Sequence, residues 1–254
     1  MSSTPLITIA VPSYNQGQYL DAALESIFEQ GILTEVFVAD GGSQDESIDI
    51  LRKWDHRLAG WVSTPDDGQA AAINWAVAKG SAPYVCWLNS DDLLLAGGLR
   101  KLLAALEIHS NAPFAYGRVF RANHDLSQSK EIFTYPFSPR LMANLCIVSQ
   151  PGTLIRRTAW EAGNGLDTRL QMTMDYDLWW RLFKHFGSPL YVSDFVAIDR
   201  NHSATKTNTR RRDHYIEAMS VVKRHFGRIP LKWYVAWPYA VWYRSLRWRL
   251  RSSK

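Results

Sequence analysis

With 254 residues, 46% of them hydrophobic, the chain is long enough for one large domain with a sizeable core. The net charge of +5 is unevenly placed: residues 1–217 hold 20 Lys and Arg against 24 Asp and Glu, whereas residues 218–254 hold 9 Lys and Arg and no acid. A net acidic body argues against a nucleic-acid-binding protein, and we expect no nucleic-acid partner. No apolar run reaches the roughly 18 residues of a membrane-spanning helix, and residues 1–5 lack the basic start of a signal peptide. The two cysteines, Cys86 and Cys146, form no metal or disulfide pattern, as expected in a reducing cytosol.

Strand and helix patterns alternate four times in the first part of the chain. This alternation predicts a doubly wound, mainly parallel α/β sheet with right-handed crossovers. Neither a G-x-G-x-x-G loop nor a G-x-x-x-x-G-K-[ST] loop follows a strand, which disfavours a dinucleotide site and a P-loop. The expected strands are residues 6–11, 35–39, 61–63 and 84–88, and the expected helices are residues 20–28, 45–54, 68–79 and 98–108.

The second part of the chain changes character. Shorter and less regular strand patterns predict a mixed extension of the sheet, and a polar segment at residues 201–212 predicts a loop. We expect Pro230 and Pro238 to break the C-terminal tail into short helices. The expected strands are residues 114–120, 131–135, 153–156 and 190–198, and the expected helices are residues 174–186 and 214–226.

Two adjacent carboxylates, Asp91 and Asp92, end a short apolar run that reads as a buried strand. Because neighbouring carboxylates repel each other, a divalent cation such as Mg²⁺ or Mn²⁺ is the simplest partner that would offset the repulsion, and it could also hold a diphosphate. The alternative is structural: Asp91 would cap a helix that starts at Leu93, with Asp92 in its first turn.

Acidic residues follow several of the predicted strands, at Asp40, Asp67, Asp91 and Asp92. A single acid after a strand is usually a turn or cap residue. Several acids at one edge are more informative, because ligands bind outside the carboxyl ends of the strands in open α/β sheets. The sequence therefore predicts a ligand site at this edge.

The order and spacing of these motifs resemble the nucleotide-sugar domain of a family 2 glycosyltransferase with the GT-A fold, and the resemblance covers about 200 residues. Two residues depart from the family pattern, Met174 and Asn89, where relatives often carry an acid. The matching segments in the first half are residues 11–15, 38–45, 67–74 and 88–92, and those downstream are residues 150–157, 174–182 and 200–203.

The resemblance implies a Rossmann-like α/β fold with a mainly parallel sheet, a mixed acceptor-side extension and C-terminal helices. It divides the chain into a donor-binding half (1–110), an acceptor half that carries the catalytic base (111–215) and a basic aromatic tail (216–254). The donor-binding residues that it implies are Pro12, Ser13, Tyr14, Asn15, Asp40, Asp67, Gln69, Asn89, Ser90 and Asp91. The metal ligands would be Asp91 and Asp92, with a less specific contribution from His202, which alone would more often be an exposed loop residue.

Asp175 matches the family's general base, which takes the proton from the acceptor hydroxyl. The alternative is that Asp175 only caps the helix that begins there. Asp177 lies two residues further on and would point away, so we expect it to be structural. Trp179 and Trp180 could stack on a sugar, but we expect core packing for at least one of them. Composition alone offers Arg157, Arg200 or Lys206 as charges near a diphosphate.

The tail mixes aromatic side chains with cations, a composition suited to the interface of an anionic membrane. The alternative is a packed helix with a solvated basic face. The aromatic residues are Trp233, Tyr234, Trp237, Tyr239, Trp242, Tyr243 and Trp248, and the cations are Lys232, Arg244, Arg247, Arg249, Arg251 and Lys254.

The resemblance therefore predicts an inverting, metal-dependent glycosyltransferase that uses a nucleoside-diphosphate sugar, with UDP as the first candidate nucleotide. We expect the acceptor to be a saccharide attached to a lipid carrier. The product would be a bacterial surface polysaccharide such as O-antigen, capsule or exopolysaccharide. The enzyme would be cytoplasmic and peripheral on the inner face of the cell membrane. Two alternatives stay open: a catalytically inactive membrane-peripheral binding subunit, and a sugar nucleotidyltransferase, which would need a Gly-rich basic loop after the first strand that residues 12–15 do not provide.

Overall fold

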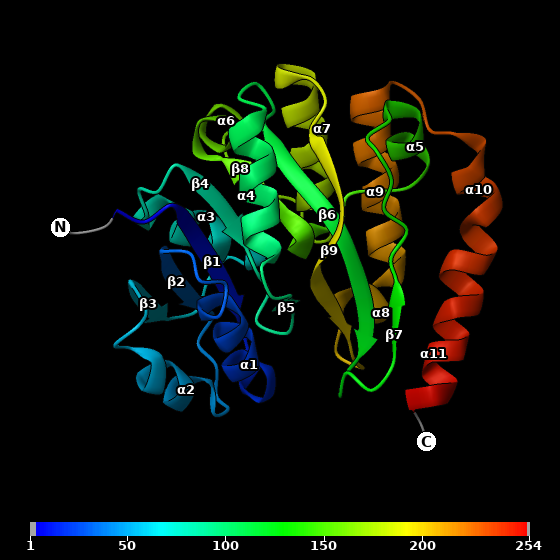
Figure 1. The fold of residues 1–254 in the computed structure, drawn as a ribbon. Helices are drawn as coiled ribbons and strands as arrows, with labels where there is room; N and C mark the ends of the chain where they lie inside the picture. The colour runs from blue at the N-terminus through cyan, green and yellow to red at the C-terminus, as the bar shows by residue number, and fades with distance from the viewer. Residues whose placement is uncertain (1–3, 253–254) are drawn as a thin grey trace.

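One sheet of nine strands runs through the part of the chain that the computed structural model describes, residues 4–252, with side chains described through residue 248 (Figure 1). Its strand order is β3-β2-β1-β4-β8-β6-β9-β5, and β7 pairs with β6 outside this path. The strands are β1 (Ile7–Ser13), β2 (Thr34–Asp40), β3 (Gly60–Ser63), β4 (Tyr84–Trp87), β5 (Leu93–Leu94), β6 (Phe114–Asn123), β7 (Ser129–Glu131), β8 (Thr153–Arg156) and β9 (Leu190–Asn201).

Helices cover both faces of the sheet. Buried side chains of α1, α2 and α4 pack on one face, and those of α3, α6, α7 and α9 belong to the core on the other. Burial on both faces explains why β1 reads as a continuous apolar strand. The helices are α1 (Gly17–Phe28), α2 (Ser47–Trp54), α3 (Gln69–Lys79), α4 (Gly98–Ile108), α5 (Pro139–Asn144), α6 (Arg157–Ala162), α7 (Met174–Phe186), α8 (Lys206–Thr209), α9 (Arg211–Phe226), α10 (Leu231–Trp237) and α11 (Arg244–Ser252).

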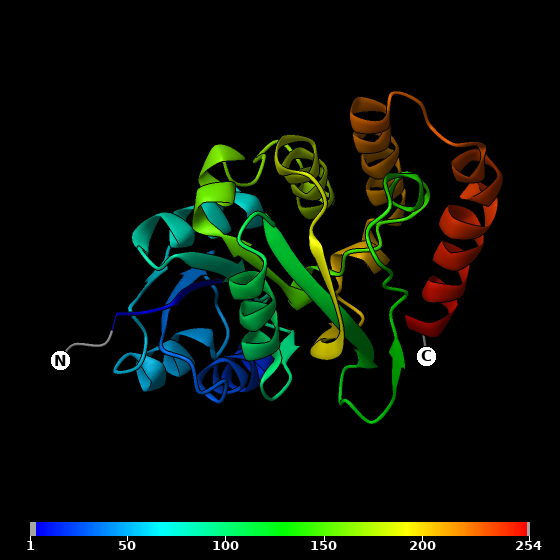
Figure 2. The ribbon, with the colours of Figure 1, turned by 45° about the horizontal axis from the view of Figure 1, so that its top comes forward.

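The four strands of the first half are parallel, as predicted. β1 pairs with β2 and β4, and β2 pairs with β3, so the carboxyl ends of these strands meet at one edge. The mixed extension is also confirmed: β8 runs antiparallel to β4 and β6, and β6 runs parallel to β9. The sheet therefore continues from the first half into the second without interruption (Figure 2).

The structural alternative for the paired carboxylates is wrong. No helix starts at Leu93; this residue and Leu94 form β5, which runs antiparallel to β9 at Ile198 and Ala197. The reason is pairing with a strand about 100 residues away, which a local capping pattern cannot reveal. Asp91 and Asp92 thus lie in the short connection between β4 and β5.

Two other expectations need correction. The strand predicted at residues 131–135 ends at Glu131, and beyond it Phe133 and Tyr135 stack on each other with exposed rings. Pro238 does not end a helix, because α10 continues through a π-helical segment (Pro238–Tyr243) into α11.

Figures 1 and 2 both show α10 and α11 as an outer layer beyond α9. Within residues 4–252, no helix is long and apolar enough to cross a membrane. Residues 1–3 and Lys254 lie outside the described residues, and so do the side chains of Arg249 and Arg251.

Candidate functional site

A cavity of about 760 Å³ lies at the carboxyl ends of β1 and β4 and extends to the start of α7, the end of β9 and α9. It brings together most of the residues that the sequence predicts for the site. These are Pro12, Ser13, Tyr14, Asn15, Gln69, Asn89, Ser90, Asp91, Asp92 and Asp175. Asp40, Asp67 and His202 are outside its lining.

The loop after β1 is held in place by the loop after β2. The Asn15 N–H donates to Ser43 Oγ at 2.7 Å, and the Gln44 N–H donates to Asn15 Oδ1 at 2.9 Å. Asn15 has a φ of 50°, a left-handed conformation that Asn tolerates better than most residues. Tyr14 is 62% exposed at the cavity, so its ring is available to a ligand.

Asp40 lies beneath this loop and is almost fully buried. Its carboxylate accepts hydrogen bonds from the Gly42 and Ser43 N–H groups and from the hydroxyls of Ser43 and Ser63. In the structure it therefore shapes the loop after β2, which in turn holds the cavity-lining loop after β1 through Ser43 and Asn15. Its expected contact with the nucleoside stays a prediction.

Asp66, which the sequence analysis missed, lines the cavity, whereas its neighbour Asp67 is exposed outside it. Asp66 Oδ1 accepts the Gly68 N–H at 2.8 Å, and Gly68 has a φ of 100° that favours glycine. This turn starts α3 and places Gln69, whose Nε2 donates to Asn89 Oδ1 at 2.6 Å. The local sequence does not indicate which of the adjacent residues Asp66 and Asp67 faces the cavity.

Asp92 is 4% exposed and accepts hydrogen bonds from the Arg200 N–H and from Asn89 Nδ2, both at 2.9 Å. Burial, reinforced by the negative charges of Asp91 and Asp199, raises the pKa of Asp92 well above its usual range. Asp91 Oδ2 lies 2.9 Å from Nε2 of His202. His202 is a buried loop residue, contrary to the exposed position that is usual for a single loop histidine.

Asp91 and Asp92 are suited to bind a divalent cation whose remaining ligands come from a diphosphate. Asp91 and Asp92 supply hard oxygen ligands, and a cation would relieve the repulsion that raises the pKa of Asp92. Within residues 4–248, no three His, Cys, Asp or Glu side chains form a ligating group, so the chain offers no closed cage. Mg²⁺ commonly binds in this open way, through one or two carboxylates plus phosphate oxygens.

Of the cations that composition offered, two line the cavity. Arg200 Nε donates to the Asp91 carbonyl oxygen, and Lys206 Nζ donates to Gln69 Oε1 at 3.2 Å. Arg157 lies elsewhere: its guanidinium donates to the Ala82 carbonyl oxygen and Thr8 Oγ1, at the amino ends of β4 and β1. The suggestion of a diphosphate contact for Arg157 is therefore wrong, because the cavity lies at the opposite, carboxyl ends of these strands.

Asp175 lies in the first turn of α7 and lines the cavity. Burial raises its pKa to about 6, and the negative charge of Glu217 adds to the shift. The N-cap position of α7 is Thr173, so the alternative that Asp175 is the cap is wrong. A carboxyl group with a pKa near neutrality at a cavity wall can exchange a proton with a bound hydroxyl.

Asp177 is structural, as predicted. It is 1% exposed and contacts Arg181 at 2.6 Å and Nε2 of His225 at 2.7 Å. These partners hold the pKa of Asp177 at about 2 despite its burial. Trp179 and Trp180 are both buried in the core and do not line the cavity.

Glu217, on α9, holds the segment before Asp175, and the sequence analysis missed it. Its Oε1 accepts the N–H groups of Met172 and Thr173 at 2.7 Å and the Thr173 hydroxyl at 2.9 Å. The carboxylate thus satisfies donors at the start of α7 from a distant helix. No local pattern around Glu217 indicates this role.

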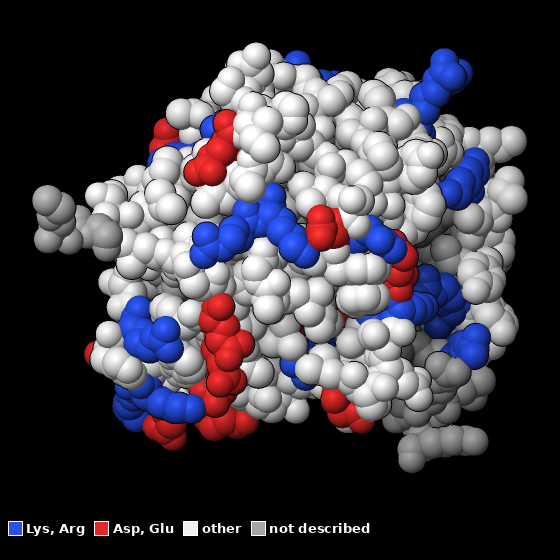
Figure 3. All heavy atoms as spheres, in the orientation of Figure 1, with Lys and Arg blue, Asp and Glu red and all other residues white. Residues whose placement is uncertain are grey.

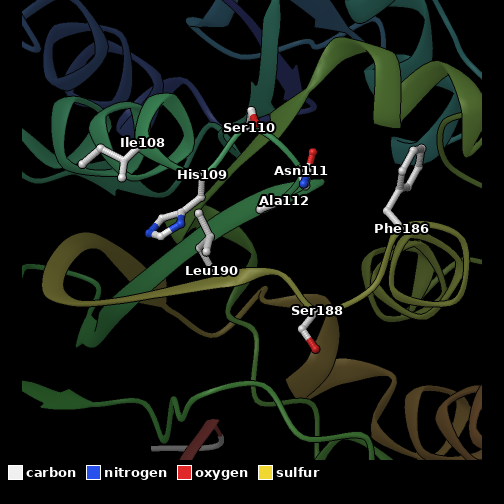
Figure 4. Close-up of a pocket in the computed structure, with 8 residues that line it drawn as sticks. All are labelled: Ile108, His109, Ser110, Asn111, Ala112, Phe186, Ser188 and Leu190. Carbon is white, nitrogen blue, oxygen red and sulfur yellow. The ribbon is translucent and has the colours of Figure 1, made fainter.

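A second hollow, of about 390 Å³, lies at the far end of α4 (Figure 4). Its lining has no carboxylate and no Lys or Arg, so it offers no comparable chemistry. The lining residues are Ile108, His109, Ser110, Asn111, Ala112, Phe186, Ser188 and Leu190.

Comparison with solved structures shows the fold. The chain superposes on S. aureus TarS in complex with UDP-GlcNAc with a TM-score of 0.71 at 16% identity, covering 87% of this chain and 66% of that one. It also superposes on the mannosyltransferase PcManGT from Pyrobaculum calidifontis, in complex with GDP-Man and Mn²⁺, with a TM-score of 0.68 at 18% identity, covering 99% and 76%. The expected GT-A fold is confirmed.

Sequence relatives are bacterial glycosyltransferases. Hyaluronan synthase of Pasteurella multocida is 23% identical over 242 residues, covering 92% of this chain and 24% of that protein. The putative colanic acid biosynthesis glycosyl transferase WcaA of Escherichia coli K12 is 24% identical over 263 residues, covering 98% and 92%. The chain spans about a quarter of the length of the hyaluronan synthase and 34% of the Escherichia coli chondroitin synthase. The model of glycosyl transferase family 2 matches residues 8–162, more than half of the chain, and the chain belongs to this family.

Proposed function

We propose that the chain transfers a sugar from a nucleoside-diphosphate sugar to a saccharide acceptor, with inversion at the anomeric carbon. The observation that carries the proposal is the single cavity that joins the loop after β1, the Asp91–Asp92 pair and Asp175. A nucleotide, a diphosphate and an acceptor hydroxyl each need one of these three parts. A purely binding subunit has no need for a carboxyl group with a pKa of about 6 at the cavity wall.

The transfer needs one base and one leaving group. The Asp175 carboxylate takes the proton of the acceptor hydroxyl as its oxygen bonds to the anomeric carbon, while the bond from that carbon to the diphosphate breaks and the nucleoside diphosphate leaves. The other carboxylates of the cavity are engaged: Asp66 by the Gly68 N–H, Asp91 by His202, Asp92 by the Arg200 N–H and Asp199 by Arg121. No second carboxylate in the described lining is poised as a covalent nucleophile, which supports direct displacement.

Asp91 and Asp92 would hold Mg²⁺ or Mn²⁺ together with the donor diphosphate. The ion would neutralise the charge that develops on the leaving group. The lining residues Arg200 and Lys206 lie beside this pair, and burial lowers the pKa of Lys206. The Mn²⁺ complex of PcManGT supports a divalent cation in this fold.

The relatives support a choice of donor and of pathway. Solved structures of similar fold contain UDP, UDP-GlcNAc or GDP-Man, so UDP sugars are the first donors to examine. The named sequence relatives are a hyaluronan synthase, chondroitin synthases and a putative colanic acid biosynthesis transferase, which supports a role in bacterial surface polysaccharide synthesis. We propose that the acceptor is attached to a lipid carrier, because the tail presents aromatic and basic side chains suited to a membrane surface.

The tail would hold the enzyme on the cytoplasmic face of the cell membrane. Leu231, Val235 and Trp242 are 74%, 72% and 65% exposed, and residues 218–254 contain no acid to repel anionic lipid. Trp242→Glu should abolish binding to phosphatidylcholine vesicles that contain phosphatidylglycerol. Ile108→Glu, which places the same charge on an equally exposed apolar residue far from the tail, should bind them like the wild type. Equal binding of both variants would contradict the membrane role.

Titration calorimetry with UDP, GDP and dTDP, each with and without Mn²⁺, tests the donor site. We expect one nucleotide to bind tightly only with Mn²⁺, and Asp92→Asn to remove the effect of the metal. Asp49→Asn is the matched control, since the Asp49 side chain is exposed on α2 and lies outside the cavity. If the folded wild type binds none of the three, the donor site, and with it the proposed function, is wrong.

A further inference from the structure

Three arginines from separate parts of the chain lie at one end of the cavity, where Arg121 is in its lining and Arg211 and Arg244 are just outside it. Arg121 lies on β6, Arg211 is the first residue of α9, and Arg244 is the first residue of α11. Arg121 lines the cavity together with His214, one turn into α9. The π-helical segment packs on α9 and α11 packs on α8, which brings the tail to this place.

This end of the cavity is separate from the nucleotide loop. In the sheet, β1 and β2 lie on one side of β4, whereas β6 and β9 lie on the other. The loop after β1 therefore lines one end, and Arg121 on β6 lines the opposite one. In Figure 3, which has the orientation of Figure 1, Lys and Arg side chains lie at the right of the molecule, on the side of the tail.

The charges of this cluster are poorly compensated. Among the described residues, no Asp or Glu pairs with Arg211 or Arg244, and the buried Nε of Arg211 has no hydrogen-bond acceptor. Arg211 donates only through Nη2, to Asn208 Oδ1 at 3.0 Å. Arg121 does pair with Asp199, at 2.6 Å, but 42% of its side chain stays exposed. A buried donor without a partner costs free energy unless a ligand supplies the acceptor.

Burial and mutual repulsion both lower pKa values within the cluster. Burial lowers the pKa of Arg211, and the charges of Arg244 and Arg121 lower it further. Burial also lowers the pKa of His214, where the same three arginines act against the opposing charge of Glu217. The N-terminus of α9 adds its own partial positive charge. An anion at this point would relieve all of these interactions together.

We propose that Arg121, Arg211 and Arg244 bind a phosphate group beside the acceptor end of the cavity. Neighbouring guanidinium groups suit a phosphate, because each planar guanidinium can donate paired hydrogen bonds to its oxygens. This site differs from the donor diphosphate site, because its cations come from the chain itself and need no metal. That the phosphate belongs to the acceptor rests on the proposed function. The group comes either from a phosphorylated acceptor in the cavity or from a lipid headgroup beside the tail.

The test is calorimetric titration of the full chain with inorganic phosphate in buffer that contains EDTA, so that no metal recruits phosphate to Asp91 and Asp92. The variant Arg211→Gln/Arg244→Gln should bind phosphate about tenfold more weakly than the wild type. Arg212→Gln/Arg247→Gln removes the same charge from exposed positions on the same two helices and should bind within twofold of the wild type. Arg211→Lys/Arg244→Lys should recover part of the loss, which separates charge from misfolding.

Vesicles distinguish the two sources of phosphate. If the phosphate is on the acceptor, both Gln double variants should lose the same affinity for vesicles of phosphatidylcholine and phosphatidylglycerol. If it is a headgroup, only the Arg211→Gln/Arg244→Gln variant should lose that affinity. Equal phosphate binding by the wild type and both Gln variants would overturn the site. UDP binding in the same preparations is the separate readout of the proposed function, so the two can fail independently.

Discussion

The two walls of the cavity are held together in different ways. On the proposed donor side, polar residues are fixed by neighbours at the same sheet edge, as Asn15 is by Ser43 and Gln69 by Asn89. On the acceptor side, the segment before Asp175 is fixed by Glu217, 42 or more residues further along the chain and on a helix outside the sheet. The donor wall therefore depends on strand pairing, whereas the acceptor wall depends on how α9 packs against α7.

This difference has a consequence for evolution and engineering alike. A wall built on paired strands keeps its geometry when surface helices change. A wall held by α9 can be reshaped by changes in that helix or in the tail that packs on it, without disturbing the nucleotide loop. Substitutions on the two sides should therefore separate donor binding from transfer.

Replacing Asp175 with Asn gives the sharpest separation. Loss of a general base lowers the rate by about 100-fold or more, so transfer should become barely measurable in a coupled assay for released nucleoside diphosphate. Donor binding, measured by calorimetry, should stay at the wild-type level, since the donor wall does not use Asp175. Near-normal transfer by this variant would show that the base lies elsewhere.

Asp177→Asn tests the packing that supports the acceptor wall. Removing one partner of a buried ion pair lowers the free energy of unfolding by roughly 3–5 kcal/mol. Asp177→Asn would leave both Arg181 and His225 without their carboxylate partner. Chemical denaturation should show that loss, whereas Asp49→Asn, in the exposed pair with Arg52, should cost about 1 kcal/mol or less. Equal losses would contradict the difference between the two pairs.

Asp177 also makes stability depend on pH in a defined window. Its pKa of about 2 in the folded chain lies below the ordinary value of about 4. The stabilisation is therefore complete above pH 4 or so, and it should be lost as the pH falls from about 4 towards 2. Acid unfolding followed by circular dichroism should show this loss in the wild type and a flatter profile in Asp177→Asn.

Changes in the pH dependence of the transfer rate should be smaller than the effects above. In the proposed mechanism Asp175 acts as a base, so the rate should rise with pH through its pKa of about 6 and level off above it. Glu217→Gln removes the charge that helps to raise this pKa, so the rising limb should move to lower pH, with a few-fold lower maximum from the weakened anchor. Asp213→Asn, one turn earlier on the exposed side of α9, should leave the profile in place. An unmoved limb in Glu217→Gln would show that Glu217 does not tune Asp175.

The sequence predicted the donor wall better than the acceptor wall for a physical reason. Motifs at the ends of parallel strands are local, and the sheet brings them together wherever the strands pair, as for residues 12–15 and 89–92. The role of Glu217 and the burial of His202 depend on contacts with residues far away in the sequence. The local spacing of apolar residues cannot predict such contacts. The same limitation explains why β5 escaped prediction, since Leu93 and Leu94 become a strand only because β9 lies beside them.

The π-helical segment of the tail determines which way the tail faces. Two of its buried positions, Trp233 and Val241, are eight residues apart, which is nearly one residue more than two turns of an α-helix. The wider turn at Pro238–Tyr243 absorbs the extra residue, so the inner and outer faces stay aligned along the whole tail. Deleting one residue there would turn α11 by about 100° relative to α10. The segment thus sets the rotation of α11 relative to α10, so that Arg244 lies near Arg211 while Leu231 and Val235 face outward.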